Sequence, residues 1–333
     1  MRDAQNPRET REPILEVRNV KKYFPVNAGL FKKPLQVKAV DDVSFTMYKG
    51  ETLGLVGESG CGKSTLGRTI VRLYEPTAGE IIFKGDDISH LSSHKLKYLR
   101  QQMQLIFQDP YSSLNPRMNV NSIVGEAMLT HKLVKKGEEY ENRVIEIIEK
   151  CGLASYHVNR YPHQFSGGQR QRIGVARALA LNPDFIVADE PVSALDVSVQ
   201  SQVLNMMNSL KDEFGLSYLF ISHDLSVVKH ISDRIGVMYL GSLIELTNKN
   251  ALYERPLHPY TKALLAAIPE PDPTKIKKME AIKGEIPSNI NTPSGCKFHT
   301  RCPYMKDICK EEIPEFREYE PDHFVACHFA GEI

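Results

Sequence analysis

The chain has 333 residues, of which 41% are hydrophobic, and its 42 basic and 41 acidic side chains leave a net charge of +1. This composition fits a globular protein with a sizeable core and excludes a disordered or fibrous chain. The near-zero charge excludes a global field that would draw the protein onto nucleic acid or an acidic membrane, so any bound anion must meet a local site.

Residues 1–12 form a polar N-terminal tail that lacks the apolar core of a signal peptide. No uncharged apolar run approaches the roughly 18 residues of a membrane span. We therefore expect a soluble, cytoplasmic chain, in which cysteine thiols are normally kept reduced.

Short apolar runs that predict strands alternate with helix-like stretches along the chain. The runs are 14–17, 51–57, 80–85, 103–109, 184–190, 216–224 and 234–240. Apolar residues at helical spacing follow the second run and recur over 197–215. Strands that alternate with helices predict an α/β fold with a mostly parallel sheet.

The strand pattern stops within the stretch of about 110–165, where Val144, Ile147, Ile148 and Cys151 have helical spacing. We expect a helical subdomain there, inserted into a main domain of residues 13–250. After residue 250 the sequence becomes rich in Pro, Lys, Glu and Cys, which predicts a separate, loop-rich C-terminal extension over 251–333.

The segment GESGCGKST fits the phosphate-loop pattern G-x-x-x-x-G-K-[ST] and lies between an apolar strand and a helix. Its glycines allow the backbone to turn tightly and to aim amides at phosphate oxygens. Lys63 is expected to reach the β- and γ-phosphates and Ser64 to bind Mg²⁺, whereas a Gly-rich turn without a ligand is the alternative. The predicted contacts are Gly57, Ser59, Gly60, Cys61, Gly62, Lys63, Ser64 and Thr65.

Two carboxylates, Asp189 and Glu190, end the apolar run DFIVADE. Alone they fit a solvated strand edge equally well. Beside a phosphate loop they fit a Mg²⁺ ligand followed by a residue that polarises the attacking water, because phosphoryl transfer needs positioning and charge neutralisation.

Between these motifs, FSGGQRQR (165–172) resembles the signature motif of the nucleotide-binding subunits of ABC transporters, with Phe165 in place of the more usual Leu. The resemblance implies a P-loop NTPase fold of the ABC type, with ATP and Mg²⁺ as cofactors. Ser166 and the following glycines precede a helix and form a second anion-binding terminus. In the family this terminus serves the ATP of a partner subunit, through residues that match Ser166, Gly168 and Gln169.

Other motifs follow in the family's order. Tyr23 resembles the aromatic residue that stacks on adenine, Gln108 the Mg²⁺-sensing glutamine, and His223 the switch histidine at the γ-phosphate. Asp196 ends SALD, which is similar to the loop that crosses the dimer interface. The resemblance thus implies three catalytic residues, Glu190, His223 and Gln108. It also implies that Mg²⁺ is bound by Ser64, Gln108 and Asp189. Read alone, Tyr23 fits an ordinary strand aromatic and His223 a surface histidine.

The C-terminal tail indicates one subfamily of these ATPases. The segments LYERPLHPYTKALLAAIP and SGCKFHTRCP look like the tail of the dipeptide and oligopeptide importer ATPases, and the insertion at 25–36 is similar to theirs. This likeness implies a peripheral ATPase at the cytoplasmic face of the membrane. Its partners would be a second nucleotide-binding subunit, two permease subunits and, indirectly, a peptide-binding protein, with no nucleic acid. The alternatives are an importer of another solute such as nickel, a soluble ABC ATPase that works on DNA or ribosomes, and a redox sensor.

Four cysteines of the tail, Cys296, Cys302, Cys309 and Cys327, are separated by five, six and 17 residues. Structural zinc sites usually contain close cysteine pairs, which are missing here, so the spacing favours an iron–sulfur cluster. The resemblance points to [4Fe–4S], while zinc and unligated or disulfide-paired cysteines remain alternatives. His299, His323 and His328 lie nearby in the sequence. We expect the bound metal to hold the loops of the tail together and to be dispensable for the chemistry of the phosphate site.

Overall fold

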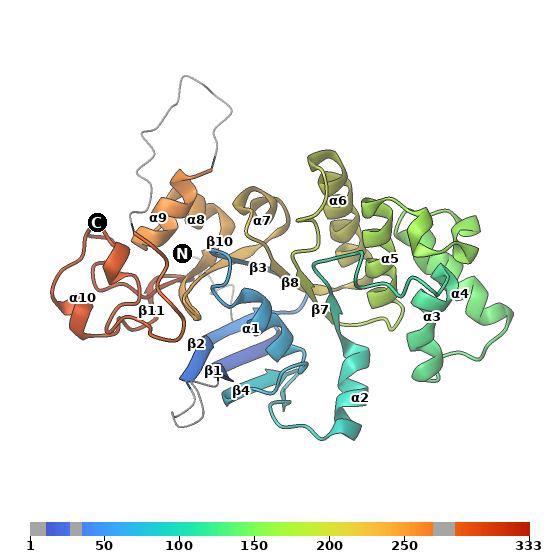
Figure 1. Ribbon diagram of the computed structural model, residues 1–333, viewed down its shortest axis with the longest axis horizontal. Coiled ribbons are helices and arrows are strands. Elements are labelled where there is room, and N and C mark those ends of the chain that lie inside the picture. The colour runs from blue at the N-terminus through green and yellow to red at the C-terminus, as the bar shows by residue number, and fades with distance from the viewer. Residues whose placement is uncertain (1–10, 27–34, 269–283) are drawn as a thin grey trace, which may run out of the picture. The chain divides into compact units, whose positions relative to one another are not determined.

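A computed structural model describes residues 11–26, 35–268 and 284–333 of the chain, which form an α/β structure (Figure 1). It divides into two compact units. The first comprises Tyr48–Glu51 and Leu91–Ile221, with the described residues up to Pro13, and the second comprises the described parts of Ile14–Met47, Thr52–His90 and Ser222–Ile333. The predicted boundary at residue 250 lies inside the second unit and stays a prediction.

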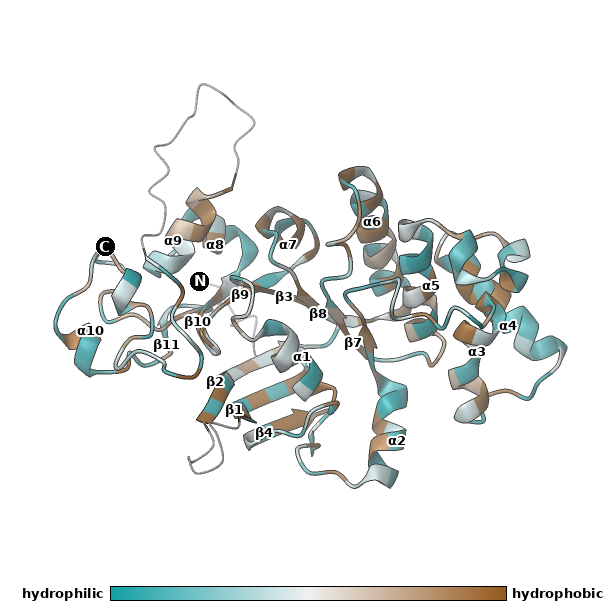
Figure 2. Ribbon diagram, in the orientation of Figure 1, coloured by the Kyte–Doolittle hydropathy of each residue, from teal (hydrophilic) through white to brown (hydrophobic). Residues whose placement is uncertain are grey.

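The first unit is built on three parallel strands in the order β8-β7-β6. These are β6 (Met103–Ile106), β7 (Phe185–Asp189) and β8 (Ser217–Ile221). All residues of β7 and β8 are buried, and both strands appear hydrophobic in Figure 2. A continuous apolar run of this kind is typical of a parallel strand that is covered on both faces.

Helices complete this unit. They are α2 (Ser93–Gln102), α3 (Val120–Thr130), α4 (Glu138–Lys150), α5 (Gly167–Leu179) and α6 (Val197–Phe214), with short 3₁₀ turns η1 (Ser155–Asn159) and η2 (Pro162–Gln164). Of these, α3 and α4 lie within the stretch of about 110–165 where a helical subdomain is predicted. The α4 helix buries Tyr140, Val144, Ile147 and Ile148, whereas its charged face is exposed. The predicted pattern therefore identified the buried face of this helix.

The second unit contains a sheet with the order β11-β12-β10-β9-β3. Its strands are β3 (Thr52–Val56), β9 (Arg234–Tyr239), β10 (Ser242–Asn248), β11 (Arg317–Glu320) and β12 (His323–Val325). Among the described residues of this sheet, β3 and β9 pair in parallel, whereas β9 and β10, β10 and β12, and β12 and β11 pair antiparallel. A separate sheet has the order β2-β1-β4-β5, in which β4 pairs antiparallel with β1 and with β5. Its strands are β1 (Pro13–Val26), β2 (Leu35–Tyr48), β4 (Ala78–Phe83) and β5 (Asp86–Asp87).

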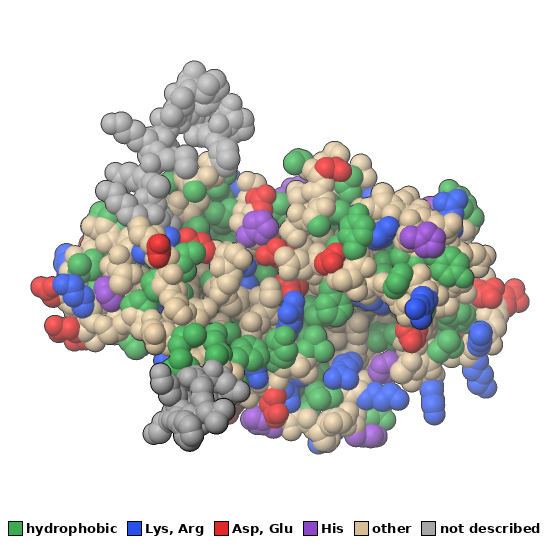
Figure 3. Space-filling view, in the orientation of Figure 1, with side chains coloured by type: hydrophobic (Ala, Val, Ile, Leu, Met, Phe, Trp, Pro, Cys, Tyr) green, Lys and Arg blue, Asp and Glu red, His purple; other side chains and the backbone are tan. Residues whose placement is uncertain are grey.

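The described helices of this unit are short: α1 (Lys63–Ile70), α7 (Leu225–Ile231), α8 (Lys249–Glu254), α9 (Pro259–Ala266), η4 (His299–Arg301) and α10 (Ile308–Glu311). Among the described residues, no helix combines the length and apolar character that crossing a membrane requires. Acidic and basic side chains both lie on the face in Figure 3.

The described part of the C-terminal extension contributes strands β11 and β12 to the second unit's sheet. Strand β12 pairs with β10, with Glu245 opposite Val325. The fully buried Glu245 carboxylate accepts hydrogen bonds from the backbone N–H groups of Leu257 and His258, and lies 2.7 Å from Nε2 of His323. One buried side chain therefore joins the sheet to two segments of the extension.

Each of the seven predicted runs overlaps a strand, but β2, β5, β10, β11 and β12 were not predicted. Much of the polar tail, part of the insertion at 25–36 and the prolines at 269, 271 and 273 lie outside the described residues.

Candidate functional site

The phosphate loop connects β3 to α1 in the second unit, and Lys63 is the first residue of α1. At two positions of the loop the neighbouring backbone is so close that only glycine fits. A Cβ atom at Gly57 would lie 2.3 Å from the carbonyl oxygen of Met238, and one at Gly62 would lie 2.0 Å from that of Ala39. Both residues also have positive φ angles, so the loop needs glycine for space as well as for conformation.

The Lys63 side chain is only 4% exposed and fills the inside of this loop. Its Nζ atom donates hydrogen bonds to the carbonyl oxygens of Gly57 at 2.7 Å and Glu58 at 3.0 Å. Cys61 is buried beside it, and burial raises the pKa of its thiol. Ser59 and Gly60 are exposed, so the tip of the loop is open to solvent.

Tyr23, on β1, also lies in the second unit. Its hydroxyl group donates a hydrogen bond to Asp41, which accepts another from Nζ of Lys297 at 2.8 Å. Burial pushes the pKa of Asp41 upward, but these two hydrogen bonds, together with the charges of Lys297 and Lys38, hold the pKa below its ordinary value. The ring of Tyr23 is thus tethered at its hydroxyl end, whereas its stacking on adenine stays a prediction.

The C-terminal extension contacts the phosphate loop, which the sequence did not reveal. Arg301 pairs with Glu58, the hydroxyl of Tyr260 accepts a hydrogen bond from the Glu58 N–H at 3.0 Å, and Asn289 donates one to the Gly60 carbonyl at 3.0 Å. The loop and the extension also line a common pocket of ≈ 290 Å³. These contacts run against the expectation that the cysteine region is independent of the phosphate site.

The two predicted carboxylates lie in the first unit, at the end of β7. Asp189 is fully buried as the last residue of the strand. Glu190 has φ +48, a left-handed conformation that is strained for a side chain of this size. Gln108 donates a hydrogen bond from Nε2 to Oε2 of Glu190 at 2.9 Å, so the structure brings together two of the three predicted catalytic residues.

The signature segment, also in the first unit, begins α5. The hydroxyl of Ser166 accepts a hydrogen bond from the Gln169 N–H, and the Gln169 side chain accepts one from the Ser166 N–H, which forms a capping box. A Cβ atom at Gly168 would lie 2.3 Å from a methyl carbon of Val199. Ser166 is exposed, so this helix start is open to solvent.

Two further predicted residues lie at helix starts. Asp196 caps α6 and accepts hydrogen bonds from the Val199 N–H and the Ser198 hydroxyl, which lower the pKa of its carboxyl group. The adjacent Val197, the first residue of α6, is 78% exposed. His223 is exposed in the second unit, directly before Asp224, the N-cap of α7.

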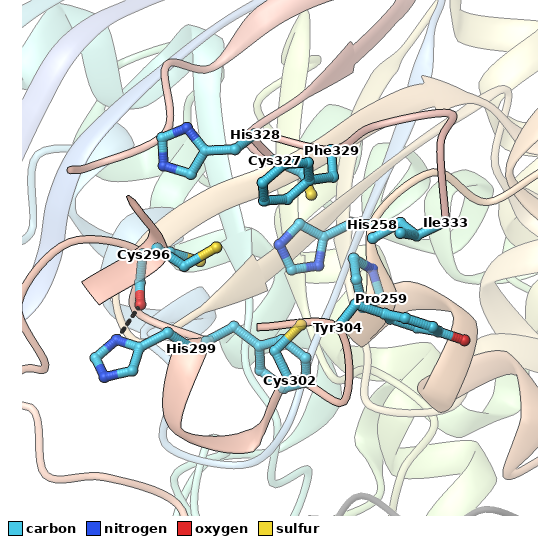
Figure 4. A pocket seen from close by; sticks show the side chains of 12 residues that line it. His258, Pro259, Cys296, His299, Cys302, Tyr304, Cys327, His328, Phe329 and Ile333 are labelled. Carbon is cyan, nitrogen blue, oxygen red and sulfur yellow. Dashed lines mark hydrogen bonds between the residues drawn. The ribbon is translucent and has the colours of Figure 1, made fainter. Parts of the chain in front are cut away.

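All four C-terminal cysteines line one pocket. The sulfur atoms of Cys296, Cys302 and Cys327 point into it, and the ring of His258 lies among them (Figure 4). Burial, and then the charges of the other cysteines, raise the pKa values of Cys296 and Cys327 to about 11. The topology therefore gathers four thiols that are spread over 32 residues of sequence.

The histidines near these cysteines have different environments. His299 and His328 line the pocket, but each has a ring nitrogen in contact with a backbone carbonyl group, and His323 pairs with Glu245. Sequence reasoning missed His258, a pocket residue whose pKa burial lowers to about 4. In the described parts of the chain, no three His, Cys, Asp or Glu side chains are arranged to hold a single metal ion.

Comparisons with known proteins identify similar chains. Residues 40–193 match the family described as ABC transporter, and residues 244–309 match the oligopeptide/dipeptide transporter C-terminal region. The oligopeptide transport ATP-binding proteins AppF and OppF of Bacillus subtilis (strain 168) are 61% and 54% identical. Their alignments cover 96% and 95% of this chain, and 98% and 96% of the respective relatives.

Among solved structures, the dimeric ATP-binding cassette MJ0796 bound to ADP and Pi is 28% identical, with a TM-score of 0.64. The match covers 71% of this chain and 99% of that one.

Proposed function

This chain belongs to the family of ATP-binding subunits of ABC peptide transporters, and from this membership we propose that its motifs bind and hydrolyse ATP to power the import of oligopeptides or dipeptides. The observation that carries the proposal is the phosphate loop, in which Gly57 and Gly62 have no room for a side chain and Lys63 lies inside the loop. A loop of this construction presents backbone amides and one cation to a triphosphate.

The roles of the residues follow from their chemistry. Lys63 and the loop amides would bind the phosphates, with Ser64 and Asp189 as ligands of Mg²⁺, which neutralises charge on the phosphates when it is bound. Glu190 would accept a proton from the attacking water, and Gln108 would orient Glu190 through the hydrogen bond between them. His223 and Tyr23 are proposed at the γ-phosphate and the adenine.

The family implies a dimeric ATPase with membrane permease partners. We propose a site on the cytoplasmic face of the membrane, two permease subunits, and a peptide-binding protein that delivers the cargo. Ser166, Gly168, Gln169 and Asp196 would act on the ATP of the second nucleotide-binding subunit, which is either a homologous chain or another copy. The solvent-open start of α5 supports this assignment. No observation favours nickel, DNA or ribosomes as the alternative target.

Lys63→Ala is expected to weaken the binding of Mg·ATP by roughly 10- to 100-fold, because it removes a charge-assisted contact to the phosphates. Fluorescence titration of the purified chain with a labelled ATP analogue measures the change. Lys49→Ala, at an exposed lysine, is the matched control. Unchanged affinity in Lys63→Ala would contradict the assignment of the phosphate loop.

We propose that Cys296, Cys302, Cys309 and Cys327 hold a [4Fe–4S] cluster. In such a cluster each cysteine binds a different iron, so four sulfurs surround a volume and do not converge on one point. Four thiols that line one pocket supply the four ligands of such a cluster, and their sequence spacing lacks the close pairs of a structural zinc site. When bound, the cluster would cross-link the loops of the extension.

Cys302→Ser is expected to abolish cluster binding, because it removes one of four thiolate ligands. Anaerobically purified wild-type protein should be brown and contain about four irons and four sulfides per chain, the content of one such cluster. Cys151→Ser, at a buried cysteine of the first unit, should keep the iron. Colourless protein with one zinc per chain would rule out the cluster.

A further inference from the structure

The phosphate loop carries an acidic residue, Glu58, directly after its first glycine. A carboxylate in a loop that receives a triphosphate repels its ligand, unless a cation compensates for the charge. The side chain of Glu58 is 22% exposed, so solvent screens its charge only in part. The loop therefore needs a partner for this side chain.

Arg301 supplies that cation from the C-terminal extension, 243 residues away in the sequence. Its two terminal nitrogens donate to the two oxygens of Glu58 at 2.9 and 3.1 Å, which is a bidentate pair. The Arg301 side chain is only 5% exposed. Its guanidinium group also contacts the hydroxyl of Tyr239 at 3.4 Å. The bidentate pair with a buried arginine therefore holds the carboxylate of Glu58 in a single orientation.

The residues around Arg301 hold it rigidly. Phe298 is 2% exposed and makes edge contacts with the rings of Tyr239 and Tyr260, with centroid distances of 5.3 and 5.4 Å. Lys297 donates hydrogen bonds to Asp41, Ser242 and the Leu240 carbonyl group. Arg301 thus belongs to a packed segment, 297–301, that also reaches the Asp41 partner of Tyr23.

We propose that Arg301 is a positioning residue of the ATP site: it neutralises Glu58 and holds its carboxylate in a fixed ion pair, so that the amides of the phosphate loop and Lys63 receive the triphosphate without an uncompensated negative charge. The proposal deepens the proposed function and rests on it. It assigns the segment between Cys296 and Cys302 an electrostatic role in nucleotide affinity.

Arg301→Met keeps much of the side-chain volume but removes the charge. We expect it to raise the Kd for Mg·ATP about tenfold, the scale of one charge–charge interaction close to a protein surface. Glu58→Gln should instead lower the Kd, because Arg301 then faces the phosphates without a carboxylate beside it. The double variant Arg301→Met/Glu58→Gln should return the Kd to within about twofold of the wild-type value, since both charges are removed.

The measurement is titration of the full-length chain, purified anaerobically, with Mg·ATP and Mg·ADP at low and high salt. The Arg301→Met defect should be larger for ATP than for ADP and should shrink at high salt, because it is electrostatic. Arg301→Lys, which keeps the charge but loses the bidentate geometry, should be intermediate. Arg255→Met is the matched control, because Arg255 pairs with the exposed side of the extension at Glu320.

A merely structural ion pair makes different predictions. Both single variants would then weaken binding, and the double variant would stay as weak as Arg301→Met. Either result, or wild-type affinity in Arg301→Met, overturns the proposal. If Arg301→Met does not fold, the Kd of Glu58→Gln for Mg·ATP still decides between the two: a lower Kd than the wild type supports the proposal, and a higher Kd overturns it. Absence of ATP binding by the wild-type protein, or an unaffected Lys63→Ala variant, would instead contradict the proposed function.

Discussion

Glu190→Gln is expected to lower ATP turnover by at least ~10²-fold, the scale of lost general-base help, while ATP binding persists. The amide keeps the shape of the side chain and its contact with Gln108, but it cannot accept the proton of the attacking water. Because hydrolysis would no longer release the subunits, ATP should hold the variant as a dimer. Steady-state phosphate release and size-exclusion chromatography with ATP measure the two effects.

Glu146→Gln serves as the matched control, because Glu146 is an exposed surface residue paired with Lys150 on α4. Its turnover should equal that of the wild type, since such surface pairs contribute little. Near-normal turnover in a clean preparation of Glu190→Gln would remove Glu190 from the catalytic residues.

Ser166→Arg should abolish most ATPase activity, by a factor of ~10² or more, if the start of α5 completes the active site of a partner subunit. A long cation at this exposed helix start would occupy the place proposed for the partner's γ-phosphate and prevent dimer closure. The phosphate loop of the same chain is unchanged, so its ATP affinity should persist. Turnover as a function of protein concentration, together with nucleotide titration, separates the two effects.

Ser166→Ala is the control for the capping role of the same residue. It removes the hydroxyl group that caps α5, at a cost of about 1 kcal/mol, without adding bulk or charge. It should therefore lose much less activity than Ser166→Arg. Turnover that is independent of protein concentration and survives Ser166→Arg would contradict an active site shared between subunits.

The parts of the site that the sequence predicted are local in the chain. The phosphate loop needs glycine at Gly57 and Gly62 because the backbone leaves no space there, and this requirement is visible in the residue types themselves. The predicted helix start at Ser166 is local in the same way, and the structure adds that Ser166 and Gln169 cap it. Buried parallel strands such as β7 appear as apolar runs, so their positions were predictable as well.

The parts that were not predicted depend on contacts between distant segments. Glu58 and Arg301 are 243 residues apart, and nothing near either residue indicates its partner. Strand β12 has three residues and β11 has four, too few for a recognisable alternation, so the tail looked like a loop-rich appendage. The antiparallel pairing of β12 with β10, not the composition of the tail, places it in the sheet.

The buried carboxylate of Glu245 has a genetic consequence. A premature stop codon after residue 250 would spare every nucleotide-binding motif, yet it would strip Glu245 of its hydrogen bonds to Leu257, His258 and His323 and leave β10 as an open sheet edge. Such an allele would behave as a null and not as a deregulated ATPase. Recombination therefore cannot exchange the part of the gene that encodes residues 251–333 freely between transporters, because this part functions only together with the β10 residues that contact it.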